Sequence, residues 1–238
     1  MKLDILAFGA HPDDVELGAG ATLAKEIANG ATVGIIDLTQ GELGTRGSAV
    51  LRKVEAENAK NILGVAVREN LKFADGFFIN DKTHQLEVIK MIRKYQPKIV
   101  LCNAVSDRHI DHPKGSKLVS DACFLSGLQK IETTLNGVKQ DKWRPAVVYH
   151  YIQWENITPD FVVDVTGFID KKNAAVLAYS SQFYDPKSGE AATPITSKNF
   201  LDSITYRAQD LGRLIGTDYA EGFTAARFVA VKSLNNLI

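Results

Sequence analysis

Short apolar segments alternate with amphipathic segments over the first half of this 238-residue chain. We predict strands at 3–8, 31–38, 71–73 and 98–102, and helices at 15–29, 49–63, 82–95 and from Pro113 to about Leu125. Strands and helices that alternate at this rhythm favour right-handed crossovers. The predicted fold class is therefore α/β, with a mainly parallel sheet and helices on both faces.

The second half of the chain has a less regular pattern. We predict strands at 146–152, 161–165 and 228–231, and helices at 168–179 and 197–214. Residues 180–197 form a long polar loop, and loops of this length are often functional, so this one is a candidate lid. Because no linker or repeat separates the two halves, we expect one domain over residues 1–238.

The composition narrows the class of partner. Lysine and arginine total 28 and aspartate and glutamate total 28, so no basic excess points to nucleic acid. No segment approaches the roughly 18 apolar residues of a membrane span. The first apolar run is short and contains Asp4, unlike a secretion signal. Cys102 and Cys123 stand in apolar contexts typical of buried thiols. We expect a cytoplasmic protein with no nucleic-acid or membrane partner.

Four ionisable residues follow the first predicted strand: His11, Asp13, Asp14 and Glu16. Ligands of doubly wound sheets bind at the carboxyl ends of the strands, where this group would lie. An alternative is that an aspartate here merely caps the next helix, but one would suffice and His11 would be unexplained. A nucleotide-binding turn fits poorly, because these carboxylates would repel phosphates.

A second polar group, His109, Asp111 and His112, follows the strand predicted at 98–102. Alone it could be a surface loop with a capping aspartate, but two such groups at one sheet edge favour a shared site. Two histidines and one carboxylate are a usual set of catalytic zinc ligands, which His11, Asp14 and His112 would supply. The same set also suits iron(II).

The remaining residues of the two groups can then take catalytic roles. Zinc lowers the pKa of bound water to about 7. Asp13 would take the proton, and protonated His109 would donate a hydrogen bond to the oxyanion. Asp111 would hydrogen-bond a histidine and fix its tautomer or charge. Two alternative functions are a non-catalytic sugar- or nucleotide-binding domain and a metal-dependent phosphoesterase. The spare carboxylate of Asp13 speaks against the first, and the single three-ligand site speaks against the second.

The segments 10–16 and 109–112 resemble the two signatures of the LmbE-like (PIG-L) family of zinc-dependent N-acetylglucosamine deacetylases, and 39–47 and 181–183 extend the resemblance. It implies a Rossmann-like fold, a homo-oligomer such as a hexamer, and the same metal, base and oxyanion roles for the five residues. The most similar branch is the bacillithiol-biosynthesis deacetylase, which acts on N-acetylglucosaminyl L-malate. Related amidases that act on thiol conjugates or chitooligosaccharides are the alternative.

Three further residues are candidates for substrate binding. In the resembling branch an arginine at the position of Arg52 faces the substrate, and a guanidinium suits the carboxylates of malate. The alternative is that Arg52 lies on a helix surface and pairs with Glu55 or Glu57. Arg108 would reach a site shared with a neighbouring subunit, and Glu16 would orient the metal ligands or hold a sugar hydroxyl.

Overall fold

Strand β1 (Ile5–Gly9) is buried along its whole length, and successive side chains face two different cores. Ile5 and Ala7 belong to one core, and Leu6 and Phe8 belong to the other, as the two-residue period of a strand requires. A parallel strand that is covered on both faces has a continuous apolar sequence, and this is the pattern that predicted a strand at 3–8. The structure, a computed structural model, describes residues 1–236.

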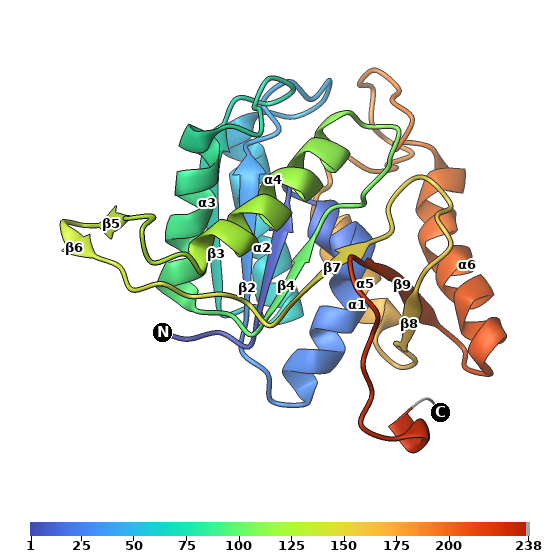
Figure 1. Ribbon diagram of the computed structural model, residues 1–238. Coiled ribbons are helices and arrows are strands. Elements are labelled where there is room, and N and C mark those ends of the chain that lie inside the picture. Colours follow the sequence, from blue (N-terminus) through green and yellow to red (C-terminus); the bar gives the residue numbers. More distant parts are fainter. Residues whose placement is uncertain (237–238) are drawn as a thin grey trace.

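The described residues form strands and helices in the order shown in Figure 1. The other strands are β2 (Val33–Thr39), β3 (Val67–Phe73), β4 (Ile99–Cys102), β5 (Thr134–Leu135), β6 (Val138–Lys139), β7 (Val147–Tyr151), β8 (Phe161–Asp164) and β9 (Ala220–Ala225). The helices are α1 (Asp14–Ala28), α2 (Ala49–Leu63), α3 (Lys82–Tyr95), α4 (Asp111–Ser126), α5 (Ile169–Leu177) and α6 (Lys198–Ile215), and a 3-10 turn covers Leu234–Asn236.

The main sheet has the strand order β3-β2-β1-β4-β7-β9-β8. The strands from β3 to β7 are parallel, whereas β9 runs antiparallel to both β7 and β8. Helices α1, α2 and α5 contribute to one core, and α3 and α4 contribute to the core on the opposite face. Helix α6 packs against β9. The predicted α/β fold with a mainly parallel sheet and helices on both faces is confirmed.

Three details of the sequence prediction are corrected. The strand expected at 228–231 is wrong: the last strand is β9, whose Glu221 and Gly222 weaken its apolar pattern, and Phe228 is fully exposed. Strand β3 begins four residues before the expected residue 71. Its start was missed because this edge strand carries charged side chains, which interrupt the apolar pattern. The small β5–β6 hairpin, which projects at the left of Figure 1, was missed because each strand has two residues.

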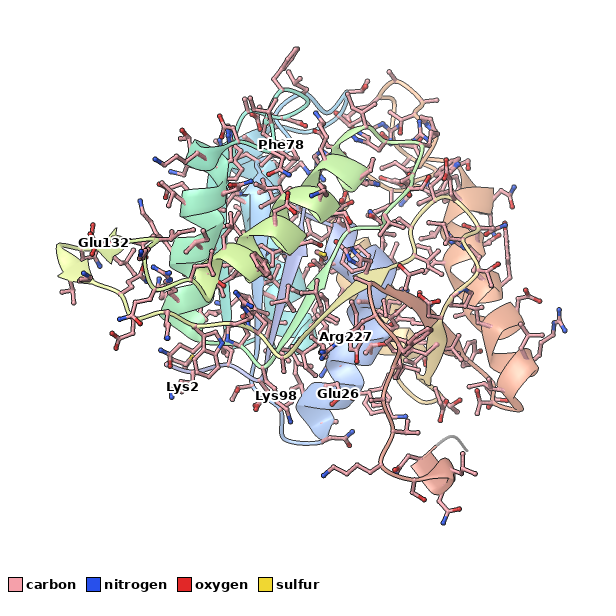
Figure 2. The ribbon with its side chains drawn as sticks, in the orientation of Figure 1. Lys2, Glu26, Phe78, Lys98, Glu132 and Arg227 are labelled. Carbon is pink, nitrogen blue, oxygen red and sulfur yellow. The ribbon has the colours of Figure 1, made fainter. Side chains whose placement is uncertain are left out.

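The strand order reverses at β1, because β2 and β3 lie on one side of it and β4 lies on the other. The carboxyl ends of β1 and β4 therefore form the crevice where doubly wound sheets bind ligands. In Figure 2 this end of the sheet is at the top, near Phe78, and Lys98, which precedes β4, is at the opposite end. Among the described helices, none is long and apolar enough to cross a membrane.

Candidate active site

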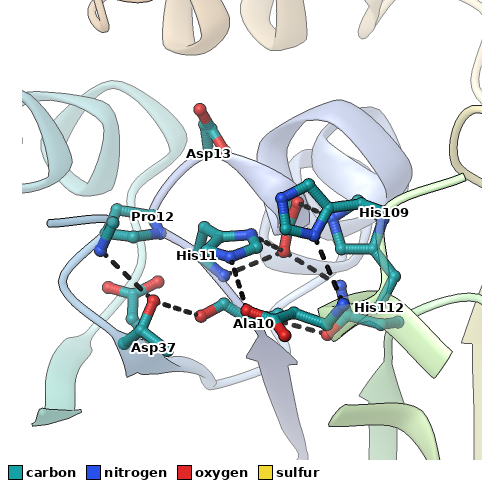
Figure 3. Close-up of polar contacts among 12 residues, drawn as sticks. Ala10, His11, Pro12, Asp13, Asp37, His109 and His112 are labelled. Atoms are coloured by element: carbon teal, nitrogen blue, oxygen red, sulfur yellow. Dashed lines mark hydrogen bonds and ion pairs between the residues drawn. The ribbon is translucent and has the colours of Figure 1, made fainter. Parts of the chain in front are cut away.

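The turn from β1 to α1 brings the first polar group into the crevice. Asp13 has a φ of 112°, which an L residue adopts only under strain, and its side chain makes no capping hydrogen bond. The carboxylate of Asp14 instead accepts the backbone N–H of His11 at 2.9 Å. The interpretation of Asp13 as a simple helix cap is therefore wrong. Figure 3 shows its carboxylate pointing away from Ala10 and Asp37.

Asp14 is held by two amide side chains from neighbouring strand ends. Asn103, directly after β4, donates to Asp14 Oδ2 at 2.9 Å, and Gln153, two residues after β7, donates to Oδ1 at 3.0 Å. The pKa of the Asp14 carboxyl lies well below its usual value, because the neighbouring His112 and His11 outweigh the effect of burial. Asp14 is thus a rigid carboxylate, as a metal ligand needs to be.

His11 and His112 both contact the carboxylate of Asp14. His11 Nδ1 lies 3.5 Å from Asp14 Oδ2, and His112 Nε2 lies 3.1 Å from Asp14 Oδ1. The opposite ring nitrogens face other carboxylates. His11 Nε2 is 3.1 Å from Asp75 and 3.3 Å from Asp111, and His112 Nδ1 is 3.5 Å from Asp107.

This arrangement fits a metal ion. Metal-binding histidines commonly donate their outer N–H to a carboxylate, which leaves the inner nitrogen unprotonated for the metal. The inner atoms are His11 Nδ1, Asp14 Oδ and His112 Nε2, the two-histidine, one-carboxylate set that suits zinc or iron(II). Ligand-like spacing is found for His11, His109 and His112, and for a second, acidic group of His11, Asp75 and Asp111. Its carboxylates already accept the backbone N–H groups of Leu43 and Gly76, so we assign it to orienting His11.

Arg52 has an unexpected partner. Its Nη2 donates to Asp13 Oδ2 at 2.7 Å and also to the Pro12 carbonyl. Both side chains are buried, and burial raises the pKa of Asp13 although Arg52 opposes the effect. The alternative that Arg52 pairs with Glu55 or Glu57 on a helix surface is wrong. Arg52 lines the cavity, but its contact with Asp13 makes it first of all a positioning residue.

His109 lies beside the two candidate metal-binding histidines. Its ring centroid is 4.6 Å from that of His11 and 4.9 Å from that of His112. Its Nδ1 accepts the backbone N–H of Asp111 at 3.3 Å, so a neutral ring carries its proton on Nε2. Burial and the charges of His11 and His112 lower the pKa of His109. This lowering acts against the protonated ring that we expected, and His109 has an Nε2–H to donate in either form.

The structure places the other three predicted site residues differently. Asp111 contacts His11 at 3.3 Å, as expected of a residue that fixes a histidine. Glu16 does not reach the cavity: it is 0% exposed and binds Arg68 and the Tyr179 hydroxyl, so its predicted substrate contact is contradicted. Arg108 lines the cavity with its guanidinium 4.5 Å above the Trp154 ring.

Sequence reasoning missed four residues that hold the site: Asp75, Asn103, Asp107 and Gln153. All four follow the carboxyl ends of strands β3, β4 and β7. Applying the strand-end rule to every strand of the sheet would have found Asp75 and Gln153. Gln153 was nevertheless not predicted, because the irregular pattern of the second half does not show where β7 lies in the sheet.

A cavity of about 580 Å³ opens over these residues. One part is lined by the polar group, including His11, Asp13, His109 and His112. The other part is lined mostly by apolar side chains of α6, β9 and the segment after β7. Residues 193–195 of the predicted lid also line it, and Arg46 holds this loop through the carbonyls of Glu190 and Ala191. The volume suits a small-molecule ligand.

The chain is similar to several known proteins. The family described as PIG-L, GlcNAc-PI de-N-acetylase, matches residues 6–123. A diacetylchitobiose deacetylase of Thermococcus kodakarensis is 30% identical over 237 residues, which cover 94% of this chain and 82% of that protein. A 4-oxalmesaconate hydratase of Pseudomonas putida is 28% identical over 192 residues, or 74% of this chain and 73% of that protein.

A solved structure is similar over almost its whole length. The conserved protein TT1542 from Thermus thermophilus has a TM-score of 0.85 and 34% sequence identity, with 97% of this chain and 98% of that chain covered. The match to a deacetylase over 94% of this chain and the family match over both polar groups lead to one conclusion. This chain belongs to the PIG-L (LmbE-like) deacetylase family.

Proposed function

We propose that this protein hydrolyses the N-acetyl group of an N-acetylglucosamine derivative to acetate and a free amine, with a divalent metal ion at His11, Asp14 and His112. The observation that carries the proposal is the position of Asp13. Its carboxylate lies in the cavity beside the three candidate ligands, under backbone strain and without a capping role. Strain of this kind is retained where function requires it.

The residues of this chain divide the chemistry among them. A bound metal ion supplies activation of water and of the acetyl carbonyl. Asp13 accepts the proton of the attacking water and returns it to the leaving nitrogen, which balances the reaction without a further acid. His109 Nε2–H donates to the carbonyl oxygen as negative charge develops there. Arg52 keeps the Asp13 carboxylate in place, and Asp75, Asp107 and Asp111 orient the two histidine ligands.

For the substrate we propose N-acetylglucosaminyl L-malate, the substrate of the bacillithiol branch that the sequence motifs resemble. A chitooligosaccharide is the alternative that the 30% identical diacetylchitobiose deacetylase favours. A thiol conjugate is a further alternative within the same amide chemistry. The 28% identical hydratase favours a second reaction, addition of water to 4-oxalmesaconate at the same cluster.

The test is acetate release by the metal-loaded protein from N-acetylglucosaminyl malate, N,N'-diacetylchitobiose and N-acetylglucosamine. Asp13→Asn keeps the side-chain shape and tolerates the positive φ, but it cannot accept the proton. We expect kcat to fall by about 10²- to 10⁴-fold, with about one metal ion per chain retained. The control is Asp210→Asn, an exposed carboxylate on α6 that pairs with Arg213.

Other outcomes would contradict the proposed function in different ways. Full activity of Asp13→Asn would exclude Asp13 as the general base. Loss of bound metal in Asp13→Asn would place that residue among the ligands instead. If metal-loaded wild type releases no acetate but consumes 4-oxalmesaconate, the deacetylase proposal is wrong and the hydratase reaction replaces it.

A further inference from the structure

One face of helix α6 lines the cavity on the side away from the β1 and β4 turns. Its cavity-lining residues are spaced three and four apart, as on one face of a helix: Phe200, Ser203, Ile204, Arg207, Ala208 and Leu211. Arg207 is the charged member of this otherwise apolar or small set. Helix α6 is the long helix at the right of Figure 1.

The guanidinium of Arg207 has no partner among residues 1–236. No carboxylate oxygen lies within 4.0 Å of it, and no hydrogen bond from it is formed. Burial lowers the pKa of Arg207, and the opposing charge of Asp107 does not offset this effect. Asp107 is itself engaged, since it accepts the backbone N–H groups of Trp154 at 2.7 Å and His109 at 3.1 Å. The structure therefore contains a partly buried cation that faces a cavity.

The other cations of the cavity are engaged. Arg52 pairs with Asp13 at 2.7 Å, and Lys172 pairs with Glu221 at 2.6 Å. Arg108 lies 4.5 Å above the Trp154 ring. Breaking either buried ion pair to bind a ligand would leave a carboxylate buried without its cation, which is costly. Arg207 can bind an anion without that loss.

We propose that Arg207 binds an anionic group, a carboxylate or a phosphate, on the aglycone of the amino-sugar substrate. This inference rests on the proposed function, because it places the acetyl group at His11, Asp13 and His109 and the aglycone toward α6. A guanidinium offers a planar fork of donors that matches carboxylate and phosphate oxygens. Phe200, Ile204 and Trp154 line the same cavity, and apolar surroundings strengthen such a contact. Arg207 thereby takes the role that the sequence suggested for Arg52.

The test compares Arg207→Gln and Arg207→Lys with wild type, using metal-loaded protein. Dissociation constants are measured by calorimetry for two anionic products, glucosaminyl malate and glucosamine 1-phosphate, and for two ligands without an anion, glucosamine and chitobiose. Acetate release from the corresponding N-acetyl compounds is measured in parallel. The matched control is Arg213→Gln on the same helix, because Arg213 is exposed and lies outside the cavity.

We expect Arg207→Gln to weaken binding of an anionic ligand by about 10- to 100-fold, the range of a charge-assisted hydrogen bond. Binding of glucosamine and chitobiose should stay within about twofold, and Arg207→Lys should retain part of the affinity because it keeps the charge without the fork. A larger loss for the malate ligand than for the phosphate ligand identifies a carboxylate, and the reverse identifies a phosphate. Arg213→Gln should match wild type throughout.

Equal losses for anionic and neutral ligands, or no loss for either anion, would overturn the Arg207 proposal. So would a wild-type protein that binds neither anion. These outcomes are separable from failure of the proposed function. Acetate release with no anion dependence refutes the Arg207 site alone, whereas Arg207-dependent anion binding without any acetate release refutes the deacetylase activity alone.

Discussion

At the scale of single residues, Asp13 and Arg52 form a pair whose members depend on each other. Both side chains are buried, and the guanidinium is the cation in contact with the Asp13 carboxylate. Removing one member of a buried pair leaves an uncompensated charge, at a cost of about 3–5 kcal/mol. We therefore expect Arg52→Ala to lower the free energy of unfolding by about that amount in urea titrations.

The same substitution in an Asp13→Asn background gives the matched comparison. Because the amide carries no charge to be stranded, Arg52→Ala should cost at least about 1 kcal/mol less there. Equal costs in the two backgrounds would show that Arg52 stabilises the protein through packing and not through its ion pair.

At the scale of elements, helix α3 begins at a carboxylate cap. Asp81 accepts the backbone N–H of His84 at 2.9 Å, and its oxygen lies 2.7 Å from His84 Nδ1. These hydrogen bonds lower the pKa of Asp81 from its ordinary value of 3.8. A carboxyl whose pKa is lower in the folded protein adds stability above its unfolded pKa, near 4, and this stability is lost as the pH falls through the folded value.

Asp81→Asn tests this pH dependence of the stability. Asparagine also caps helices but does not titrate. We expect the free energy of unfolding to fall less between pH 6 and pH 3 in the variant than in wild type, as followed by circular dichroism in urea. The remaining carboxyl groups titrate in both proteins, so the difference isolates Asp81. Curves that stay parallel over this range would contradict the prediction.

Elements of this fold were predictable where burial alone determines their sequence. Strands β1, β2 and β4 are covered on both faces, so their apolar runs were recognised. Strand β9 was not recognised, because Glu221 within it accepts the backbone N–H of Thr22 at 2.7 Å and pairs with Lys172. A glutamate with these partners is stable inside a sheet, but its partners are distant in sequence. Local patterns therefore contain no sign of them.

At the scale of the whole molecule, the candidate site depends on the order of the strands. His11 and Asp14 were predicted to lie near His112 because each group follows a strand, and the placement of β4 beside β1 brings them together. The role of Arg52 depends on the fold of α2 over the β1–α1 turn, which no spacing along the chain reveals. The same is true of Arg207, whose cavity exists only because α6 packs on β9.

The metal site would join these distant segments, because its ligands come from the starts of α1 and α4. A metal ion that binds the folded chain and not the unfolded chain raises the unfolding temperature by mass action. We expect zinc to raise the thermal midpoint of metal-free wild type, and a chelator to reverse the rise. His112→Ala should lose this response and the bound metal. His109→Ala should keep both, because its ring lies beside the ligand set without completing it. A zinc response that is lost in both His112→Ala and His109→Ala would instead place the metal in the grouping of His11, His109 and His112, which the structure also allows.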